Sequence, residues 1–172
     1  MFPSHSHATK GSIIQLNISA GGVPKSSIIE GIVEPSGLQG DRQRNLKYHG
    51  GPDRALCLWS LEITQALQKE GHPIQPGDAG ENITLSGLPW NRVSPGCQMN
   101  LGNSVLLLVT DYAPPCRTIA RYFKLRRYGR ISQKQNPGTS RLYARVLRPG
   151  VLRVGDHVGL QNMTDIGMAH EV

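Results

Sequence analysis

Two short stretches of the sequence carry residue types that could do chemistry, and the first is the loop "KYHGGPDR" at positions 47–54. Gly50 and Gly51 allow the backbone to adopt positive φ and to approach a ligand closely. Lys47, His49 and Arg54 place hydrogen-bond donors around these glycines. This composition is suited to holding an anion. A polar turn that leads into a buried strand is the alternative, and both interpretations stand at this point.

The second stretch is the corner "APPCRTIA" at positions 113–120. Pro114 and Pro115 end the preceding apolar strand because they fix φ and remove two backbone donors. Cys116 then begins a helix-like segment, with Arg117 beside it and Arg121 one turn further on. This positive potential favours the thiolate, which is both a nucleophile and a soft metal ligand. A buried, inert cysteine is the alternative, but the flanking prolines and arginines favour a functional role.

The other two cysteines fit the inert alternative better. Cys57 lies inside the apolar run "ALCLW", and Cys97 follows a Pro-Gly turn. The three cysteines are 40 and 19 residues apart, so they lack the close pairs of a structural zinc site or a disulfide framework. We therefore predict buried, unreactive thiols at positions 57 and 97.

The positive charge of the chain is concentrated in its C-terminal third. The formal net charge is +7, and the segment 112–155 contains arginines and lysines but no Asp or Glu. Such a field would concentrate an anionic ligand, which could be nucleic acid, an acidic partner protein or a phosphorylated small molecule. No recognition-helix or RNA-binding signature accompanies the few aromatic residues of this segment, which argues against nucleic acid.

The elements that must position these residues are mostly strands. Short β-branched or apolar runs bounded by Gly, Pro or Asn predict strands at 12–19, 26–33, 54–60, 82–87, 97–102, 104–110, 143–147 and 156–160. One helix is expected from Leu61 to about Glu70, with Ser60 as its N-cap and Gly71 as its terminator. A second helix is expected to start near Arg117. The fold class is therefore mainly β, a closed or nearly closed architecture with a few peripheral α-helices.

The length and hydropathy of the chain predict a single domain outside the membrane. We expect a flexible lead-in at 1–10, one domain at 11–160 and a tail at 161–172. No stretch approaches the roughly 18 consecutive apolar residues of a membrane span. The N-terminal residues lack the pattern of a secretory signal, so we expect a cytoplasmic protein.

Four motifs in order along the chain resemble those of a known family. They are "GLQGDRQRNLKYHGGPDRAL" (37–56), "GDAGENIT" (77–84), "APPCRTI" (113–119) and "YARVLRPGVLRVGDHVGL" (143–160). The order and spacing are similar to those of MOSC domains, named after the C-terminal part of molybdenum cofactor sulfurases, and most similar to the YiiM group. The resemblance covers roughly residues 11–160.

This resemblance implies a MOSC-type β-barrel around a cleft for the molybdenum cofactor (molybdopterin), in which Cys116 binds molybdenum or carries sulfur to it. The pterin carries a phosphate, which gives the loop at Lys47, His49, Gly50 and Gly51 an anionic target. Arg54, Arg117 and Arg145 are the expected charge contacts, and Asn82 is a neutral hydrogen-bonding candidate. The alternatives are that Arg145 only faces solvent and that Asn82 only makes a turn.

Three functions are compatible with the resemblance. In the first, the protein reduces small N-hydroxylated compounds, Cys116 ligates molybdenum, and a partner reductase delivers electrons because the sequence holds no dinucleotide fingerprint. In the second, Cys116 carries a persulfide to the cofactor. In the third, the protein only binds and passes on the cofactor. Pyridoxal phosphate binding enters as a family-level association, since no pyridoxal-phosphate domain of the sulfurase type is present.

The sequence departs from the YiiM pattern at two places. It has "SRLYARVL" where that group tends to have Gly-Trp-Leu-Tyr-Arg-Val, so Arg141 is expected to reshape the cleft. Only "QNMTDIGMAHEV" follows Leu160, in place of a helical extension. We therefore expect substrate access, or the contacts of a homodimer, to differ from those of the group.

Overall fold

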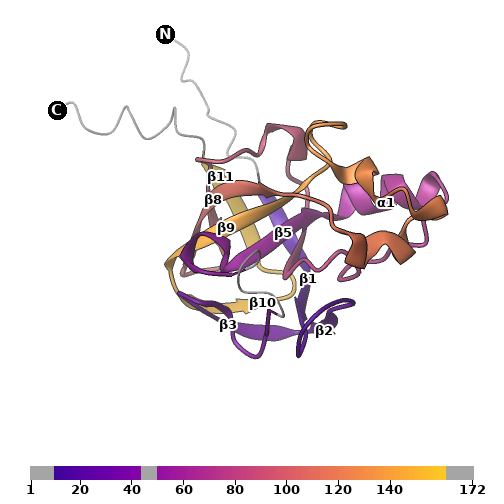
Figure 1. The fold of residues 1–172 in the computed structure, drawn as a ribbon. Coiled ribbons are helices and arrows are strands. Elements are labelled where there is room, and N and C mark those ends of the chain that lie inside the picture. The colour runs from indigo at the N-terminus through magenta and orange to yellow at the C-terminus, as the bar shows by residue number, and fades with distance from the viewer. Residues whose placement is uncertain (1–9, 44–49, 162–172) are drawn as a thin grey trace, which may run out of the picture.

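The protein forms a β-barrel with the helix at 61–69 and the helical turns at 117–131 gathered on one side, as seen in a computed structural model that describes residues 10–43 and 50–161 (Figure 1). The predicted lead-in and tail fall almost entirely outside these residues. The strands of the described residues are β1 (Lys10–Ile18), β2 (Ser26–Ile28), β3 (Glu30–Glu34), β4 (Gly37–Leu38), β5 (Leu56–Ser60), β6 (Ile83–Ser86), β7 (Gln98–Leu101), β8 (Val105–Ala113), β9 (Arg141–Arg148), β10 (Gly150–Arg153) and β11 (His157–Gln161).

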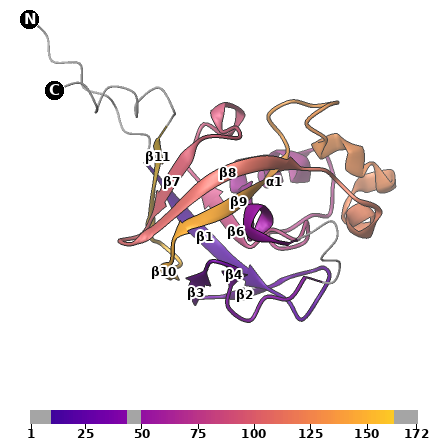
Figure 2. The same cartoon turned by 60° about the vertical axis from the view of Figure 1, so that its left-hand side comes forward.

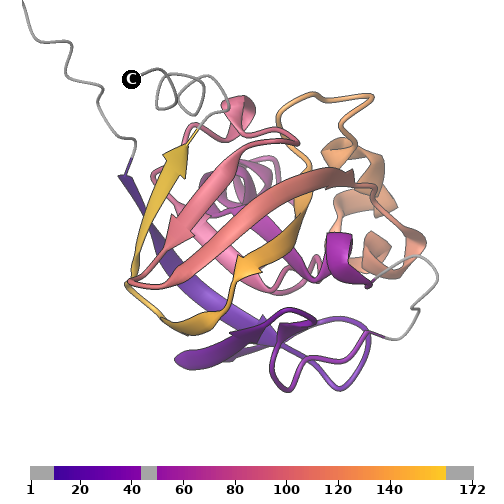
Figure 3. The same cartoon turned by 90° about the vertical axis from the view of Figure 1, so that its left-hand side faces the viewer.

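The barrel is closed by a pairing between strands from the two ends of the described chain. Its strand order is β11-β7-β8-β9-β5-β6-β1, and β1 pairs with β11, while β2 adds to the free part of β1. β5 and β6 run parallel, and the other barrel pairs are antiparallel. A small sheet of order β10-β3-β4 lies below the barrel in Figures 2 and 3. The predicted mainly β barrel is confirmed.

Alternating apolar residues fill the barrel. On β9, Leu142, Ala144 and Val146 belong to the buried core, and the residues between them face outward. This alternation is the two-residue period of a strand, and removing apolar surface from water is the main stabilising contribution. β5 is buried along its whole length, and Trp59, the residue before its last, has no exposed surface.

Both tryptophans of the chain hold the segment that enters β9. The Trp59 indole N–H donates to the Thr139 carbonyl at 3.0 Å, and the Trp90 indole N–H donates to the Ser140 carbonyl at 2.8 Å. Buried indole N–H groups need such partners. As a result, the start of β9 at Arg141 is fixed from two directions.

The first predicted helix is confirmed, whereas the second has a different form. Helix α1 (Leu61–Lys69) begins after Ser60, whose side chain accepts a hydrogen bond from the Ile63 N–H, and Gly71 follows it with φ 91°. The remaining helical turns are short 3₁₀ helices, namely η1 (Pro52–Arg54), η2 (Trp90–Arg92), η3 (Arg117–Tyr122), η4 (Lys124–Arg126) and η5 (Tyr128–Ile131).

The predicted helix does start at Arg117, but it is a short 3₁₀ helix instead of an α-helix. An α-helix over this segment would place Arg117 against Arg121 and Arg126 against Arg130, and like charges four residues apart destabilise a helix. No side chain caps the N-terminus of η3, and Leu125 and Arg126 adopt positive φ. The chain folds into three separate turns as a consequence.

Several strand boundaries also differ from expectation. The expected strand 26–33 breaks at Ile29, which is 83% exposed, because β2 pairs in the barrel while β3 pairs with β10 in the small sheet. The start of the expected strand 54–60 is taken by η1. β8 continues to Ala113, the residue before Pro114. The short strands β4 and β10 were not predicted.

Candidate functional site

The glycine loop adopts the backbone conformation that its sequence predicts. Gly50 has φ 106° and Gly51 has φ 79°, values that L side chains rarely adopt. A Cβ built on Gly51 would meet no atom within 4 Å, so open space surrounds this backbone. Lys47 and His49, two of the predicted cofactor contacts, lie outside the described residues.

The turn η1, directly after the glycines, is fastened to the outside of β8 and β9. The Thr110 hydroxyl donates to the Asp53 carbonyl, and the Asp53 carboxylate pairs with the Arg145 guanidinium at 2.6 Å. Arg54 lies 3.9 Å from the Asp111 carboxylate. The structure thus brings the glycine loop, Arg54 and Arg145 together. The side chain of Arg145 is 45% exposed, and its charge is paired with that of Asp53.

The outward face of β9 carries the polar part of the site. Arg141, Tyr143 and Arg145 alternate on this face, and Tyr143 packs with Cys57 of β5 and Ala113 of β8 in a small cluster separate from the barrel core. The Arg54 guanidinium lies 5.1 Å from the centroid of the Tyr143 ring.

The Tyr143 hydroxyl keeps its proton at neutral pH. Burial raises the pKa of Tyr143 to about 12, and Cys57 adds to the rise, whereas the guanidinium groups of Arg141 and Arg54 act in the opposite direction. The Cys116 thiol acts weakly in the same direction as burial. Two arginines and two cysteines are therefore within electrostatic range of one phenol.

Arg141 is a buried cation with no ion-pair partner among residues 10–43 and 50–161. It is 4% exposed, and its two terminal nitrogens donate to the carbonyls of Ala79 and, at 2.9 Å, Pro114. Its Nε has no hydrogen-bond partner in the same residues. A buried guanidinium without a carboxylate in direct contact carries a large desolvation cost and favours a nearby anion.

Cys116 stands at the corner that Arg141 holds. It is half-buried, has an extended backbone (φ −125°, ψ 163°), and precedes η3. Its Sγ lies 2.6 Å from the Thr118 hydroxyl, in a hydrogen bond that either group can donate. When the sulfur is a thiolate, the hydroxyl is the donor and stabilises the charge. The thiol is thus accessible and adjacent to the outward face of β9.

The other two cysteines are buried, as the sequence predicts. Cys57 is 7% exposed and Cys97 is 6% exposed. Burial raises the pKa of the Cys57 thiol to about 11, so this thiol is protonated at neutral pH. Cys116 is the one cysteine of the three whose thiol is not buried.

Asn82 lies below this surface and is engaged within the fold. It is 1% exposed, its amide oxygen accepts from the Cys57 N–H at 3.0 Å, and its amide nitrogen donates to the Asn17 carbonyl and to Asp41. The Asp41 carboxylate also pairs with Lys25 at 2.6 Å. These contacts give Asn82 a role in positioning β5, and its predicted cofactor contact stays a prediction.

Glu81, beside Asn82, caps a turn of the backbone. Its Oε1 accepts from the Gly77 N–H at 2.7 Å and from the Thr84 hydroxyl at 3.2 Å. Complete burial raises its pKa to about 7, although Arg141 and these hydrogen bonds act in the opposite direction. The side chain of Arg117, the last predicted charge contact, is exposed and makes no hydrogen bond or ion pair with another described residue.

Sequence reasoning missed Tyr143 as a member of the site and expected Arg141 only to reshape the cleft. The signal was present, because "RLYAR" alternates polar and apolar residues and so places Arg141, Tyr143 and Arg145 on one face of a strand. That this face lies beside the Cys116 corner follows only from the pairing of Ala113 with Arg141 in the β8–β9 register.

The described part of the chain contains no group of three or more His, Cys, Asp or Glu residues that could hold a metal ion. Over the same residues, no helix is long and apolar enough to cross a membrane.

The family model of the MOSC domain matches residues 45–159, well over half of the chain. The chain belongs to the MOSC domain family. This match includes the glycine loop, the Cys116 corner and β9. The family is associated in general with molybdenum cofactor binding.

Relatives of this MOSC protein include members of the YiiM group. It is 29% identical over 133 residues to YflK of Bacillus subtilis, covering 77% of this chain and 59% of YflK. It is 30% identical over 122 residues to YiiM of Escherichia coli, covering 66% of this chain and 51% of YiiM. The matches thus span between half and three fifths of these relatives. The crystal structure of YiiM from Geobacillus stearothermophilus has the same fold, with a TM-score of 0.67 and 24% identity over 88% of this chain and 75% of that one.

Proposed function

We propose that this MOSC protein binds the molybdenum cofactor and reduces N-hydroxylated compounds, with Cys116 as the metal ligand. The observation that carries the proposal is the half-buried Cys116 thiol at a corner whose Pro114 carbonyl accepts a hydrogen bond from the buried Arg141, which has no ion-pair partner in the described residues. YiiM-like membership supports the same assignment.

The residues around Cys116 fit such a group. A thiolate is a ligand for a soft metal centre, and the unpartnered Nε of Arg141 together with the Arg54 guanidinium provides positive charge for an anionic pterin. The exposed backbone at Gly51 leaves room for close approach. When bound, the cofactor would supply two-electron redox chemistry.

The protein's own groups would bind and orient the reactants. Arg54 and Arg141 would neutralise anionic charge, and the Thr118 hydroxyl would stabilise the Cys116 thiolate. The Tyr143 hydroxyl, protonated at neutral pH, offers a neutral donor. Reduction of an N–OH group to N–H consumes two electrons and two protons and releases water, so a separate reductase must deliver the electrons.

A persulfide carrier is the second candidate, favoured by the hydrogen bond between Cys116 and Thr118. In that reaction, the Cys116 thiolate would attack the outer sulfur of a donor persulfide. The donor S–S bond would break, the donor would leave as a thiolate, and Cys116 would hold the transferred sulfur. A passive cofactor carrier would need neither reaction.

The test is to purify the protein from a host that makes the cofactor and to measure bound molybdenum, bound pterin and reduction of an N-hydroxylated amidine with an artificial electron donor. We expect Cys116→Ser to lose molybdenum and activity together. Cys97→Ala, which changes a buried cysteine elsewhere in the barrel, should retain both. Retained activity in Cys116→Ser would contradict the proposal. A wild-type protein without molybdenum whose Cys116 gains the mass of one sulfur atom would favour the persulfide carrier.

A further inference from the structure

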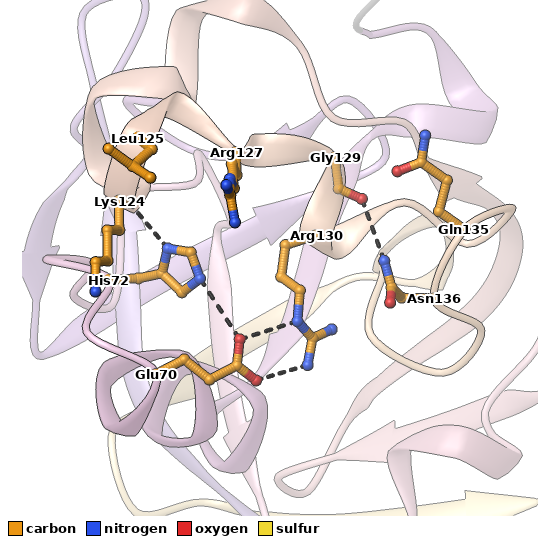
Figure 4. Close-up of a pocket in the computed structure, with 9 residues that line it drawn as sticks. All are labelled: Glu70, His72, Lys124, Leu125, Arg127, Gly129, Arg130, Gln135 and Asn136. Atoms are coloured by element: carbon orange, nitrogen blue, oxygen red, sulfur yellow. Dashed lines mark hydrogen bonds and ion pairs between the residues drawn. The ribbon is translucent and has the colours of Figure 1, made fainter.

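A cavity lies away from the Cys116 corner, between the end of α1 and the turns η4 and η5. It is open to solvent and has a volume of about 610 Å³, and none of Arg54, Cys116, Arg141 or Tyr143 lines it. Figure 4 shows the side chains that line it. Small-molecule sites have volumes of roughly 300–1,000 Å³, so this cavity has room for a ligand of nucleotide size.

One wall of the cavity is a network centred on Glu70. The Arg130 guanidinium donates to both carboxylate oxygens, at 2.7 and 3.0 Å, and these bonds hold the pKa of Glu70 below its ordinary value. His72 Nδ1 accepts from the Lys124 N–H at 2.9 Å, and His72 Nε2 lies 3.5 Å from Glu70 (Figure 4). The bidentate pair with Glu70 neutralises the Arg130 guanidinium and fixes its position.

Two further cations enter the cavity without such neutralisation. The side chains of Lys124 and Arg127 line it, and neither forms an ion pair or hydrogen bond with another residue of the described chain. Three cations against one carboxylate leave two positive charges in excess. An anion is the ligand that this balance favours.

The backbone is strained in the turn between Lys124 and Arg127. Leu125 and Arg126, between the two cations, have φ 52° and 56°. Consecutive left-handed residues other than glycine cost roughly 1–2 kcal/mol each, and such strain clusters at ligand sites. Lys124 and Arg127 both line the cavity as a result, whereas Arg126 does not.

The remaining wall offers uncharged polar groups. The side chains of Gln135 and Asn136 line it, and the Asn136 amide donates to the Gly129 carbonyl at 3.5 Å (Figure 4). Amide groups donate and accept hydrogen bonds, so they suit the polar body of an organic ligand. Leu125, 73% exposed, adds an apolar contact at the same cavity.

We propose that this cavity binds a small organic phosphate of about mononucleotide size. The phosphate lies between Lys124 and Arg127, and the organic part contacts Gln135 and Asn136. Two excess positive charges match the two negative charges of a phosphate monoester. The site requires neither Cys116 nor a bound cofactor, and it is therefore independent of the function proposed above.

Calorimetric titration with AMP, adenosine and inorganic phosphate tests the proposal. AMP should bind, and adenosine should bind at least about tenfold more weakly because it lacks the charge-assisted contacts. Arg127→Gln and Lys124→Gln should each weaken AMP binding by about tenfold. Arg126→Gln, which removes a neighbouring charge outside the cavity, should change it by less than about twofold.

Two more variants distinguish a change at this cavity from a loss of folding and from an effect at the Cys116 site. Glu70→Gln should tighten AMP binding by about two- to fivefold, because it removes a negative charge and releases Arg130, a gain that unfolding cannot produce. Cys116→Ser should bind AMP like the wild type. Equal binding of AMP and adenosine, an equal loss in Arg126→Gln and Arg127→Gln, or much tighter binding of a single-stranded oligonucleotide than of AMP would each overturn the proposal.

Discussion

Replacing Asn82 by alanine tests whether this residue holds the fold or contacts a ligand. The Asn82 side chain is buried and makes three hydrogen bonds, to the Cys57 N–H, the Asn17 carbonyl and the Asp41 carboxylate. Alanine removes all three and leaves a buried N–H and a buried carbonyl without their side-chain partner. Asp41 keeps Lys25.

The structure sets the size of the expected effect. An orphaned buried polar group costs about 1–3 kcal/mol, and a net hydrogen bond contributes about 1 kcal/mol. We expect Asn82→Ala to lower the free energy of unfolding by about 3–5 kcal/mol, a large part of the roughly 5–15 kcal/mol of an ordinary domain. Urea unfolding at pH 7, followed by the fluorescence of the buried Trp59 and Trp90, measures this loss.

Two variants sharpen the interpretation. Asn82→Asp keeps an acceptor for the Cys57 N–H but sets an oxygen against the Asp41 carboxylate, 2.9 Å from the present amide nitrogen, so it should be at least as unstable as the alanine variant. Asn103→Ala, at an exposed position, should change the free energy of unfolding by less than about 0.5 kcal/mol. If Asn82→Ala lost less than about 1 kcal/mol, the structural role assigned to its amide would be wrong.

Two further predictions concern stability. Glu81 has a pKa raised from 4.5 to about 7, so between these values the folded protein keeps a proton that the unfolded chain has released. Its contribution to the free energy of unfolding is therefore complete below about pH 4.5 and is lost as the pH rises through 7, by about 2–4 kcal/mol. Urea unfolding from pH 4.5 to 8 should show this slope in the wild type relative to Glu81→Gln, and parallel curves would refute it. Gly37→Ala should cost at least about 2 kcal/mol in the same assay, because its Cβ would lie 2.5 Å from a backbone carbonyl oxygen at φ 128°. Gly51→Ala, at φ 79° but in open space, should lower the free energy of unfolding by only about 1 kcal/mol. Equal losses in the two variants would contradict the prediction, because they would mean that the backbone shifts to relieve the close approach at position 37.

Local patterns predicted the elements whose signals are local. The helix after Ser60 has a capping residue before it and a glycine after it, and both act within one turn of the chain. The paired prolines stop β8 because they cannot join the ladder. The positive φ of Gly50 and Gly51 follows from their type in the same way.

Predictions failed where distant segments decide the outcome. Ile29 separates two strands because its neighbours pair in different sheets, and no local signal marks that division. The segment after Cys116 had helical spacing, but the repulsion between its arginines and the anchoring of Phe123 against His72 favour separate turns. Arg145 pairs with Asp53 from a remote loop, which the sequence did not predict, and its contact with the cofactor stays a prediction.

The sequence by itself determined the mainly β class, the capped helix, the glycine conformations and the family, because each depends on residue types at short spacing or on motif order. It also separated Cys116 from two buried cysteines by its immediate neighbours. Only the tertiary structure decided which charges are neutralised and which groups meet. Arg141 reaches the Cys116 corner through the register of β8 and β9, and Lys124 and Arg127 share a cavity through a left-handed turn. Pairing register joins residues far apart in sequence, and no glycine marks the left-handed turn at Leu125 and Arg126, so neither arrangement can be predicted from local composition.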